Sequence, residues 1–416
     1  MAQLAVEAPA QRTALVSRNF ILLWLGQSIS LLGDQFHLVA LPWLALQLTG
    51  SGLALGAILM VAGIPRAIFM LVGGALTDRF SPRTIMLTSD LLRAALTGLL
   101  ALLVVTDLIQ FWMLFFFAFM FGLVDAFFHP AYAAMLPRVI PRGHLEAGNA
   151  ALQVTAQLVS ALGPALGGAL IASAGVALAI GFDSVTFLVS ALALLLIRLG
   201  VHAAQTPETD ENGDEKNILD SIVDGMRYVK ADAILPTMLV ISAALNVLFG
   251  AAFGVGVPVM ADTRFPEGAA AVGVINSAFG AGALVGILIA AVVKTRNIGI
   301  TILTLIGMAG LLMIVFGAAP TLIVAAGVAV VMGVLVGYDN IIMIAWLQKR
   351  IDQSVMGRVM SLVMLSTYGL APIGSAIAGA VVEFSVEALF TGAGVCVVIV
   401  VLLGLSNKAM RSIRVD

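Results

Sequence analysis

The stretch Gly73-Gly-Ala-Leu-Thr-Asp-Arg-Phe-Ser-Pro-Arg83 separates two long apolar runs, residues 51–76 and 84–106. Each run exceeds the roughly 20 residues that a helix needs to cross a hydrocarbon core about 30 Å thick. The charged residues between the runs, Asp78, Arg79 and Arg83, are confined to the connection. A short charged loop between two spans is typical of a helical membrane protein, and the pattern continues along the chain in both directions.

The chain of 416 residues is 61% hydrophobic and 11% charged, with a mean hydropathy of +1.09. About twelve apolar runs use nearly all of it: 20–48, 51–76, 84–106, 109–136, 149–175, 177–199, 234–260, 268–293, 298–318, 320–347, 359–382 and 387–405. A transmembrane barrel would instead show short segments of alternating polarity. The sequence therefore predicts an all-α membrane protein of twelve transmembrane helices, with no large soluble domain.

The basic residues predict the orientation of these helices. They gather before the first run and after even-numbered runs, at Arg12, Arg18, Arg79, Arg83, Arg138, Arg142, Arg198, Lys294, Arg296, Lys349, Arg350, Arg358, Lys408, Arg411 and Arg414. Only Arg264 follows an odd-numbered run. Because Lys and Arg concentrate in cytoplasmic loops, we expect a multi-pass protein of the cell inner membrane with both termini in the cytoplasm.

A long polar stretch divides the runs into two sets of six. We expect a cytoplasmic N-terminal segment at 1–18, a first half at 19–199, a linker at 200–233, a second half at 234–405 and a cytoplasmic tail at 406–416. Apolar residues at helical spacing between Ile218 and Val229 predict an amphipathic helix within the linker. Matching features in the two sets, such as Pro42 and Pro258, indicate pseudo-symmetric halves, an architecture that transporters use.

The loop after the second run resembles the loop between spans two and three of the major facilitator superfamily. Gly74, Asp78, Arg79 and Arg83 match the family pattern, whereas Ser81 replaces its usual glycine. In that family the loop is a conformational latch that holds the two halves together on the cytoplasmic side. The resemblance implies the major facilitator fold here. It also implies that the latch contacts the start of the eleventh run, near Arg358.

Two further resemblances concern the direction of transport. The fifth run contains Gly163-Pro164 and Gly167-Gly168, which resemble the Gly-Pro-x-x-Gly-Gly signature of drug:proton antiporters in the superfamily. Ser30-Leu-Leu-Gly-Asp34, residues 122–137 and Leu145-Glu-Ala-Gly-Asn149 are similar to the macrolide-efflux and enterobactin-exporter branch. These resemblances imply proton-coupled efflux of an amphipathic small molecule, such as a macrolide-like drug, and a role in multidrug resistance. Export of a siderophore or a lipid-like metabolite, and uncoupled facilitation, remain the alternatives.

Ionisable residues inside the apolar runs need a function or a partner, because a charge at mid-membrane costs at least about 2.5–3.5 kcal/mol. Asp34 is the first candidate for proton coupling, and His37 lies on the same helical face. The alternative is a structural Asp34 held by Arg66 or another partner. Asp125 and His129 form a second candidate proton relay, or else a hydrogen-bonded pair that braces the kink at Pro130.

Other ionisable residues are expected to be structural. Asp90 and Arg93 are three residues apart and predict an intrahelical pair near the cytoplasmic end, where some water reaches. Asp183 begins the sixth run and is expected to be a cap near the outer surface. The remaining polar residues of the runs are candidates for the wall of a substrate cavity: His37, Arg66, Asn246, Tyr338, Asp339 and Asn340.

The sequence predicts a transporter and not an enzyme. It holds no H-E-x-x-H metal motif and no phosphate-binding G-x-x-x-x-G-K-[ST] loop, and its four His are scattered. We therefore expect no cofactor, no metal and no catalytic residue. The expected partners are a small-molecule substrate, protons and the lipid bilayer, with no nucleic acid, and the protein is expected to be a monomer.

Overall fold

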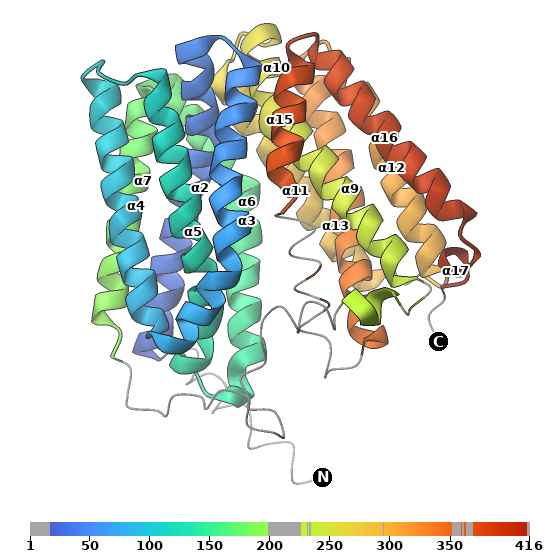
Figure 1. Ribbon diagram of the computed structural model, residues 1–416, viewed down its shortest axis with the longest axis horizontal. Coiled ribbons are helices and arrows are strands. Elements are labelled where there is room, and N and C mark those ends of the chain that lie inside the picture. The colour runs from blue at the N-terminus through green and yellow to red at the C-terminus, as the bar shows by residue number, and fades with distance from the viewer. Residues whose placement is uncertain are drawn as a thin grey trace.

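The computed structural model describes residues 17–198, 226–230, 232, 234–293, 295–351, 359, 362 and 369–413, and for 70–79 and 142 the backbone alone. Within these ranges the chain is helical and holds no strand (Figure 1). Eleven of the described helices are long and apolar enough to span a membrane, and Ala371–Val382 is a shorter apolar helix. The predicted twelve-helix architecture is confirmed.

The first half holds six long helices and a short 3₁₀ turn: α2 (Arg18–Thr49), α3 (Gly52–Arg79), α4 (Pro82–Val105), α5 (Phe111–Val139), η1 (Arg142–His144), α6 (Leu145–Ala174) and α7 (Val176–Leu196). Both ends of α2 are capped. Ser17 accepts the amide of Phe20 at the start of α2. Gly50 has a φ of 63°, a left-handed conformation that lets α2 end and α3 begin within two residues.

The second half holds α9 (Leu235–Ala251), η2 (Ala252–Gly256), α10 (Val257–Arg264), α11 (Ala269–Val292), α12 (Ile298–Gly317), α13 (Leu322–Arg350), α15 (Ala371–Val382), α16 (Val386–Ser406) and α17 (Lys408–Arg411). The segments α9, η2 and α10 form one continuous helix whose middle is a π-helical turn. Pro258, which lacks an amide hydrogen, follows this turn directly. Most of the predicted amphipathic helix, and residues 360, 361 and 363–368 of the predicted span 359–382, lie outside the described residues.

The two halves repeat one packing pattern. α2 packs against α6 and α7, as α9 packs against α15 and α16. α3 packs against α5, as α11 packs against α13, and α4 packs against α5 and α7, as α12 packs against α13 and α16. Across the interface, α6 packs against α11 and α3 against α15, which are again equivalent pairs. The predicted pseudo-symmetry is therefore confirmed by the helix contacts.

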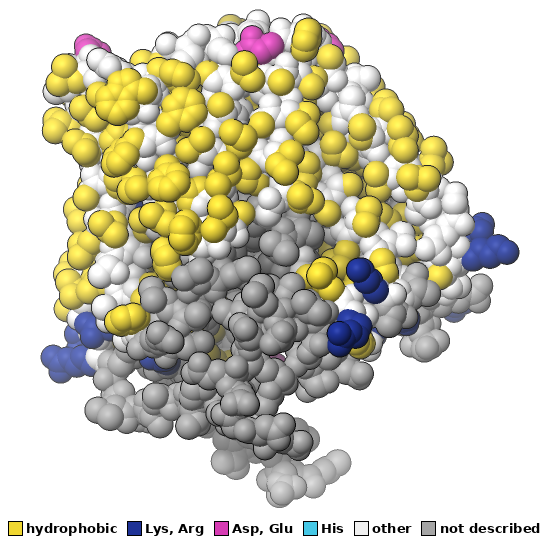
Figure 2. Space-filling view, in the orientation of Figure 1, with side chains coloured by type: hydrophobic (Ala, Val, Ile, Leu, Met, Phe, Trp, Pro, Cys, Tyr) yellow, Lys and Arg dark blue, Asp and Glu magenta, His cyan; other side chains and the backbone are white. Residues whose placement is uncertain are grey.

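Charge divides the two ends of the bundle. α2 begins and α17 lies at the lower end in Figure 1, and the Lys and Arg visible in Figure 2 lie around that end. Acidic side chains lie at the upper rim, and apolar side chains cover the belt between. We call these the basic end and the acidic end. An apolar belt between two charged rims is the surface expected of a protein that spans a bilayer.

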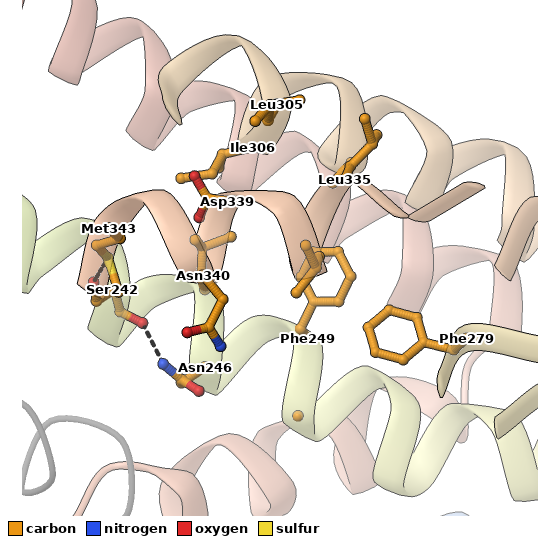
Figure 3. Close-up of a pocket in the computed structure, with 14 residues that line it drawn as sticks. Ser242, Asn246, Phe249, Phe279, Leu305, Ile306, Leu335, Asp339, Asn340 and Met343 are labelled. Carbon is orange, nitrogen blue, oxygen red and sulfur yellow. Dashed lines mark hydrogen bonds between the residues drawn. The ribbon is translucent and has the colours of Figure 1, made fainter. Parts of the chain in front are cut away.

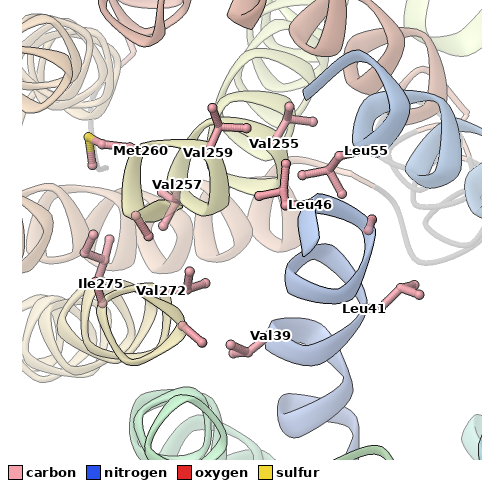
Figure 4. Packing of buried hydrophobic residues seen from close by; sticks show 14 of the residues in the cluster. Val39, Leu41, Leu46, Leu55, Val255, Val257, Val259, Met260, Val272 and Ile275 are labelled. Carbon is pink, nitrogen blue, oxygen red and sulfur yellow. The ribbon is translucent and has the colours of Figure 1, made fainter. Parts of the chain in front are cut away.

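The buried apolar core is shared by the two halves only toward the acidic end. Val39, Leu46 and Leu55 of the first half belong to one cluster with Val257 and Ile275 of the second (Figure 4). Toward the basic end the described residues form two separate clusters, one confined to 20–197 and the other to 229–413. The described conformation therefore joins the halves at the acidic end.

Small residues allow the helices of the two halves to approach closely. A Cβ added to Gly273 of α11 would lie 2.3 Å from the carbonyl oxygen of Pro164 in α6. On the other side of the interface, a Cβ on Gly56 of α3 would lie 2.5 Å from the carbonyl oxygen of Ser375 in α15. Close backbone approach through glycine is the main way in which membrane helices gain contact, since burial from lipid gives no hydrophobic gain.

A polar contact closes the rim of the acidic end. The carboxylate of Glu383, just after α15, accepts the Ser51 hydroxyl at 2.6 Å and the Leu53 amide at 2.9 Å. These donors belong to the first half and to the exposed N-terminus of α3, where a negative charge is favoured. The Leu53 amide, with the Ser51 hydroxyl, lowers the pKa of Glu383 below its ordinary value.

The Gly273→Val substitution is expected to separate the halves at the acidic end, because a branched side chain has no room against Pro164. Spin labels at the exposed positions Leu108 and Ile323, in a Cys396→Ser background, should show a longer distance component by double electron–electron resonance. Gly327→Val is the matched control, because a Cβ there meets nothing within 4 Å. A distance distribution equal to that of the control would refute the role of the α6–α11 contact.

The Glu383→Ala substitution is expected to populate the same separated state, since it removes the acceptor shared by Ser51 and Leu53. Because its pKa is lowered, the Glu383 contact is complete at neutral pH and is lost as the pH falls below the ordinary pKa of Glu and through that lowered value. The same label pair should therefore report separation in acid with wild-type protein. Glu387→Ala is the control, because Glu387 pairs with Arg264 of its own half.

Candidate functional site

A pocket of about 500 Å³ lies within the first half, walled by α2, α3, α4, α5 and α6. Arg93, which is predicted to be structural, lines it together with most of the ionisable residues predicted as functional: Asp34, His37, Arg66, Asp125 and His129. We call it the polar pocket. The structure thus brings together in one cavity side chains that the sequence distributes over four different apolar runs.

Arg93 of α4 is at the centre of the charges in the polar pocket. Its guanidinium lies 2.5 Å from Asp90 of the same helix, 3.6 Å from Asp125 of α5 and 4.0 Å from Asp34 of α2. The predicted intrahelical pair of Asp90 and Arg93 is confirmed. Its expected access to water is wrong, because Asp90 is 0% and Arg93 2% exposed. Their mutual ion pair explains how these charges are tolerated in the interior, although one Asp90 oxygen and the Arg93 Nε have no hydrogen-bond partner among the described residues.

The faces of two aromatic rings also contact the guanidinium of Arg93. It lies 3.9 Å from the ring centroid of Phe128 and 4.4 Å from that of Phe187. The negative faces of aromatic rings attract a cation, and the attraction is strongest where water is excluded. Arg93 is therefore held by carboxylates at its edge and by rings on its faces, in a fixed position at the pocket wall.

Asp34 differs from the other carboxylates of this cluster. Its side chain is 41% exposed and lies at the greatest distance from Arg93, whereas Asp125 also forms an ion pair with Arg66 of α3. The three carboxylates of Asp34, Asp90 and Asp125 face two guanidiniums, so the cluster carries one excess negative charge when every group is ionised. The expected alternative partner of Asp34, Arg66, is engaged by Asp125 instead.

His129 lines the polar pocket, but no hydrogen bond joins it to Asp125 among the described residues. The ring of its neighbour Phe128 lies edge-on to it at 6.0 Å between centroids. Asp125 is occupied by two guanidiniums, from Arg66 and Arg93. A proton relay through Asp125 and His129 therefore remains a prediction, with less support from the geometry than Asp34 has.

His37 has a partner that the sequence interpretation did not give it. Its Nδ1 lies 3.4 Å from the carboxylate of Asp183 in α7, and its ring stacks on Phe121 at 4.6 Å between centroids. The expectation that Asp183 caps a helix near the surface is wrong, because Asp183 is 0% exposed. A polar stripe at helical spacing on α7, formed by Asp183, Thr186 and Ser190, is the signal that could have indicated this burial.

The antiporter-like motif of α6 packs on two helices at once. Cβ atoms added at Gly163 and Gly167 would lie 2.7 Å and 3.0 Å from Gln35 and Phe36 of α2. A Cβ at Gly168 would lie 2.7 Å from the carbonyl oxygen of Ala269 in α11. The motif thus sets α6 against both the pocket-bearing helix α2 and the second half.

Pro164 opens the α6 helix at this same point. A proline within a helix removes one hydrogen bond and displaces the preceding turn. The Ala165 amide donates to the Ser277 hydroxyl of α11 at 2.8 Å, so a polar group of one half is satisfied by the other. Pro164 and Gly168 therefore belong to the interface between the halves, whereas Gly163 and Gly167 pack against α2. None of the four motif residues is among the described residues that line either pocket.

The candidate latch is described only in part. The side chains of Gly74, Asp78 and Arg79, and the whole of Arg358, lie outside the described residues. Arg83 donates to the carbonyls of Leu194 at 2.7 Å and Leu195 at 2.9 Å, which end α7. This is a favourable site for a cation, because the C-terminus of a helix exposes unpaired carbonyls and carries partial negative charge.

A second pocket, of about 280 Å³, lies within the second half between α9, α11, α12 and α13 (Figure 3). Its wall includes the predicted cavity residues Asn246, Asp339 and Asn340, together with Phe249 and Phe279. We call it the apolar pocket, because hydrocarbon and aromatic side chains form most of its wall. Tyr338 lines neither pocket, and its hydroxyl donates to the Val293 carbonyl at 3.1 Å.

Neither pocket resembles a metal centre. Among the residues that the structure describes, no three or more His, Cys, Asp or Glu side chains are grouped so that they could hold a metal ion. The side chains of the polar pocket are arranged as ion pairs, and those of the apolar pocket surround a single carboxylate. Such arrangements can bind and release protons and charged or amphipathic molecules.

Two efflux proteins and a transporter of solved structure are similar to this chain over most of its length. The chain is 29% identical over 362 residues to the multidrug efflux pump Tap of Mycolicibacterium fortuitum, covering 83% of this chain and 85% of that protein. It is 24% identical to macrolide efflux protein A of Streptococcus pyogenes, covering 83% and 84%. Its fold is similar to that of the nucleoside transporter NupG, with a TM-score of 0.72 at 14% identity, covering 95% and 100%.

A sequence model of one transporter family matches residues 23–375, which include all the residues of the polar and apolar pockets. The match agrees with the repeated helix contacts of two six-helix halves and with the resemblance of the loop at 73–83. The chain belongs to the Major Facilitator Superfamily.

Proposed function

We propose that this protein exports an amphipathic small molecule in exchange for protons, by alternately opening the space between its halves at the basic and the acidic end. Its membership in a transporter family and its similarity to a multidrug and a macrolide efflux protein support export. The charges of the polar pocket support proton coupling. The substrate is proposed to be macrolide-like, with a siderophore or a lipid-like metabolite as the alternative cargo.

One observation carries the proton coupling. The three carboxylates grouped around Arg93, of which Asp90 does not line the polar pocket, outnumber by one the two guanidiniums that face them. Asp90 and Asp125 lie closer to Arg93 than Asp34 does, and Asp125 has Arg66 as well. A proton on Asp34 makes the cluster neutral, and its release restores the excess charge. Asp34 is the most exposed of the three carboxylates and so has access to water that changes as the halves move.

The other titratable groups around Asp34 tune this exchange. Asp183 and His37 form a pair on the α7 side, and His129 lies on α5 in the same pocket. Gly33, next to Asp34, lies so close to α7 that an added Cβ would be 2.5 Å from the Asp183 carboxylate. Asp34 and the buried Asp183 are therefore near neighbours, and the two negative charges disfavour each other. We propose that His37 offsets this repulsion when it is protonated.

We propose that the basic end faces the cytoplasm, as the distribution of Lys and Arg favours. The described conformation is then closed toward the outside, and the polar pocket exchanges with the cytoplasmic side. When the halves rock, the loop with Gly74, Asp78, Arg79 and Arg83 is proposed to reach Arg358 and to latch the cytoplasmic side. In that state Glu383 has separated from Ser51 and Leu53, and the outer side is open.

Asp34→Asn is expected to abolish uphill transport, because the amide cannot carry a proton. In proteoliposomes with an acidic interior and a clamped membrane potential, ethidium accumulation should fall by at least about tenfold relative to wild type. Asp107→Asn is the matched control, since Asp107 is exposed in a loop with a φ of 53°, a conformation that Asn also adopts readily.

Each outcome of this experiment has a distinct meaning. Full accumulation by Asp34→Asn would remove Asp34 from the coupling step. Accumulation that survives collapse of the pH gradient by nigericin would exclude proton coupling. Wild-type protein that only equilibrates ethidium, at a rate above empty liposomes, would identify an uncoupled facilitator.

The proposed orientation is tested independently by single cysteines in a Cys396→Ser background. A cysteine in place of Ser412, at the basic end, should resist a membrane-impermeant maleimide in intact cells and react after permeabilisation. A cysteine in place of Phe384, which is 88% exposed at the acidic end, should react in intact cells. The reverse labelling pattern would show that the basic end faces outward.

A further inference from the structure

The apolar pocket of the second half contains a carboxylate that nothing described in the structure neutralises. Asp339 of α13 is 7% exposed, and its Oδ1 is buried without a hydrogen-bond partner. No Lys, Arg or His is found among the described residues that line this pocket. An ionised carboxylate in such surroundings is several kcal/mol less stable than in water unless an opposite charge reaches it.

The first half shows how this chain treats its other buried carboxylates. Asp90 and Asp125 lie within ion-pair distance of Arg93, and Asp183 lies within ion-pair distance of His37. Among the described carboxylates that line the two pockets, Asp339 is the one with no Lys, Arg or His within ion-pair distance. An ionised Asp339 would therefore need a cationic partner from outside the described residues.

The rest of the wall fits an organic cation better than a metal ion. The polar neighbours Asn246 and Ser242 are bound to each other, because the Asn246 amide donates to the Ser242 carbonyl at 2.9 Å. The Ser242 hydroxyl donates to the Met343 sulfur at 3.3 Å (Figure 3). A divalent metal ion is usually held by several oxygen ligands with more than one carboxylate, whereas the described wall supplies one carboxylate and the amides of Asn246 and Asn340.

Two aromatic side chains lie in the same pocket as Asp339. Phe249 of α9 and Phe279 of α11 project into it in Figure 3, and both line it. Aromatic faces attract cations and also accept apolar surface, so a ring or alkyl group next to a positive centre is favoured there. The volume of about 280 Å³ is close to the lower limit for small-molecule sites, and so suits one part of a larger substrate.

We propose that the apolar pocket is a subsite for the positively charged end of the cargo, in which Asp339 pairs with an organic ammonium or phosphonium group and Phe249 and Phe279 contact the apolar groups around it. The proposal rests on the transport function proposed above and narrows its substrate class to amphipathic cations. It gives the two halves different tasks, because protons bind in the polar pocket and the cation binds across the molecule from it.

The test is equilibrium binding to purified full-length protein in detergent, with no gradient present. The probes are tetraphenylphosphonium, a cation, and triphenylphosphine oxide, a neutral molecule with a similar triphenylphosphorus body. Asp339→Asn should weaken tetraphenylphosphonium binding at least about tenfold, or about 1.4 kcal/mol, while changing binding of the neutral probe less than about twofold. Asp107→Asn should leave the affinity for both probes as in wild type.

The thermal unfolding midpoint shows whether Asp339 is needed for the stability of the fold instead of for binding. Asp339→Asn keeps the side-chain shape and removes an unpaired buried charge, so the midpoint without probe should stay or rise. A lower midpoint with equal loss of both probes would overturn the subsite, as would unchanged binding of the cation. Equal wild-type affinities for the two probes would also overturn it, and would indicate that Asp339 carries a proton.

Failure of this inference is distinguishable from failure of the proposed function. If Asp339-dependent cation binding is found but proteoliposomes show no pH-driven accumulation, the subsite stands and the coupling fails. If accumulation depends on the pH gradient and on Asp34 while Asp339→Asn binds tetraphenylphosphonium normally, the export function stands and the subsite fails.

Discussion

A guanidinium buried among apolar helices must be neutralised where it lies, and Arg93 is neutralised by carboxylates from three helices. Asp90 belongs to its own helix α4, Asp125 to α5 and Asp34 to α2. This arrangement ties the helices that wall the polar pocket to one centre. It also leaves unequal partners, because Asp90 and Asp125 are closely held whereas Asp34 lies at the margin. The structural role of Arg93 and the proposed proton exchange at Asp34 are therefore two consequences of one charge balance.

In contrast to the charged polar pocket, the interface between the halves depends mainly on close packing of small and apolar residues. Among the described residues, its polar contacts are those of Ala165 with Ser277 and of Glu383. The rest is the shared apolar cluster and close backbone approach at glycines such as Gly56, Gly168 and Gly273. Such contacts are close but hold few directional bonds, so they can be exchanged for others without leaving many buried polar groups unpaired. Helix α6 links the polar pocket to the interface between the halves, because Gly163 and Gly167 fit against α2 while Gly168 fits against α11.

The two pockets differ in charge although the helices around them repeat one pattern. The polar pocket holds paired acids and bases on α2 to α5, whereas the apolar pocket holds Asp339 among aromatic and aliphatic side chains. Duplicated halves thus keep the same backbone packing but need not keep the same chemistry, because the packing depends on small residues and the chemistry on a few polar ones. This asymmetry is the basis for the separate proton and cargo sites that we propose.

The sequence determined the helical membrane architecture, because backbone groups in lipid must be paired within each span and apolar length alone reveals a span. It determined the two-half repeat, the family loop at 73–83 and the pairing of Asp90 with Arg93, which needs only helical periodicity. Only the tertiary structure decided that Arg66 pairs with Asp125 and that Asp183 is buried beside His37. It also decided that Asp339 has no cationic neighbour in its pocket. Those relations depend on how helices far apart in the chain are rotated against each other, and no local pattern encodes that rotation.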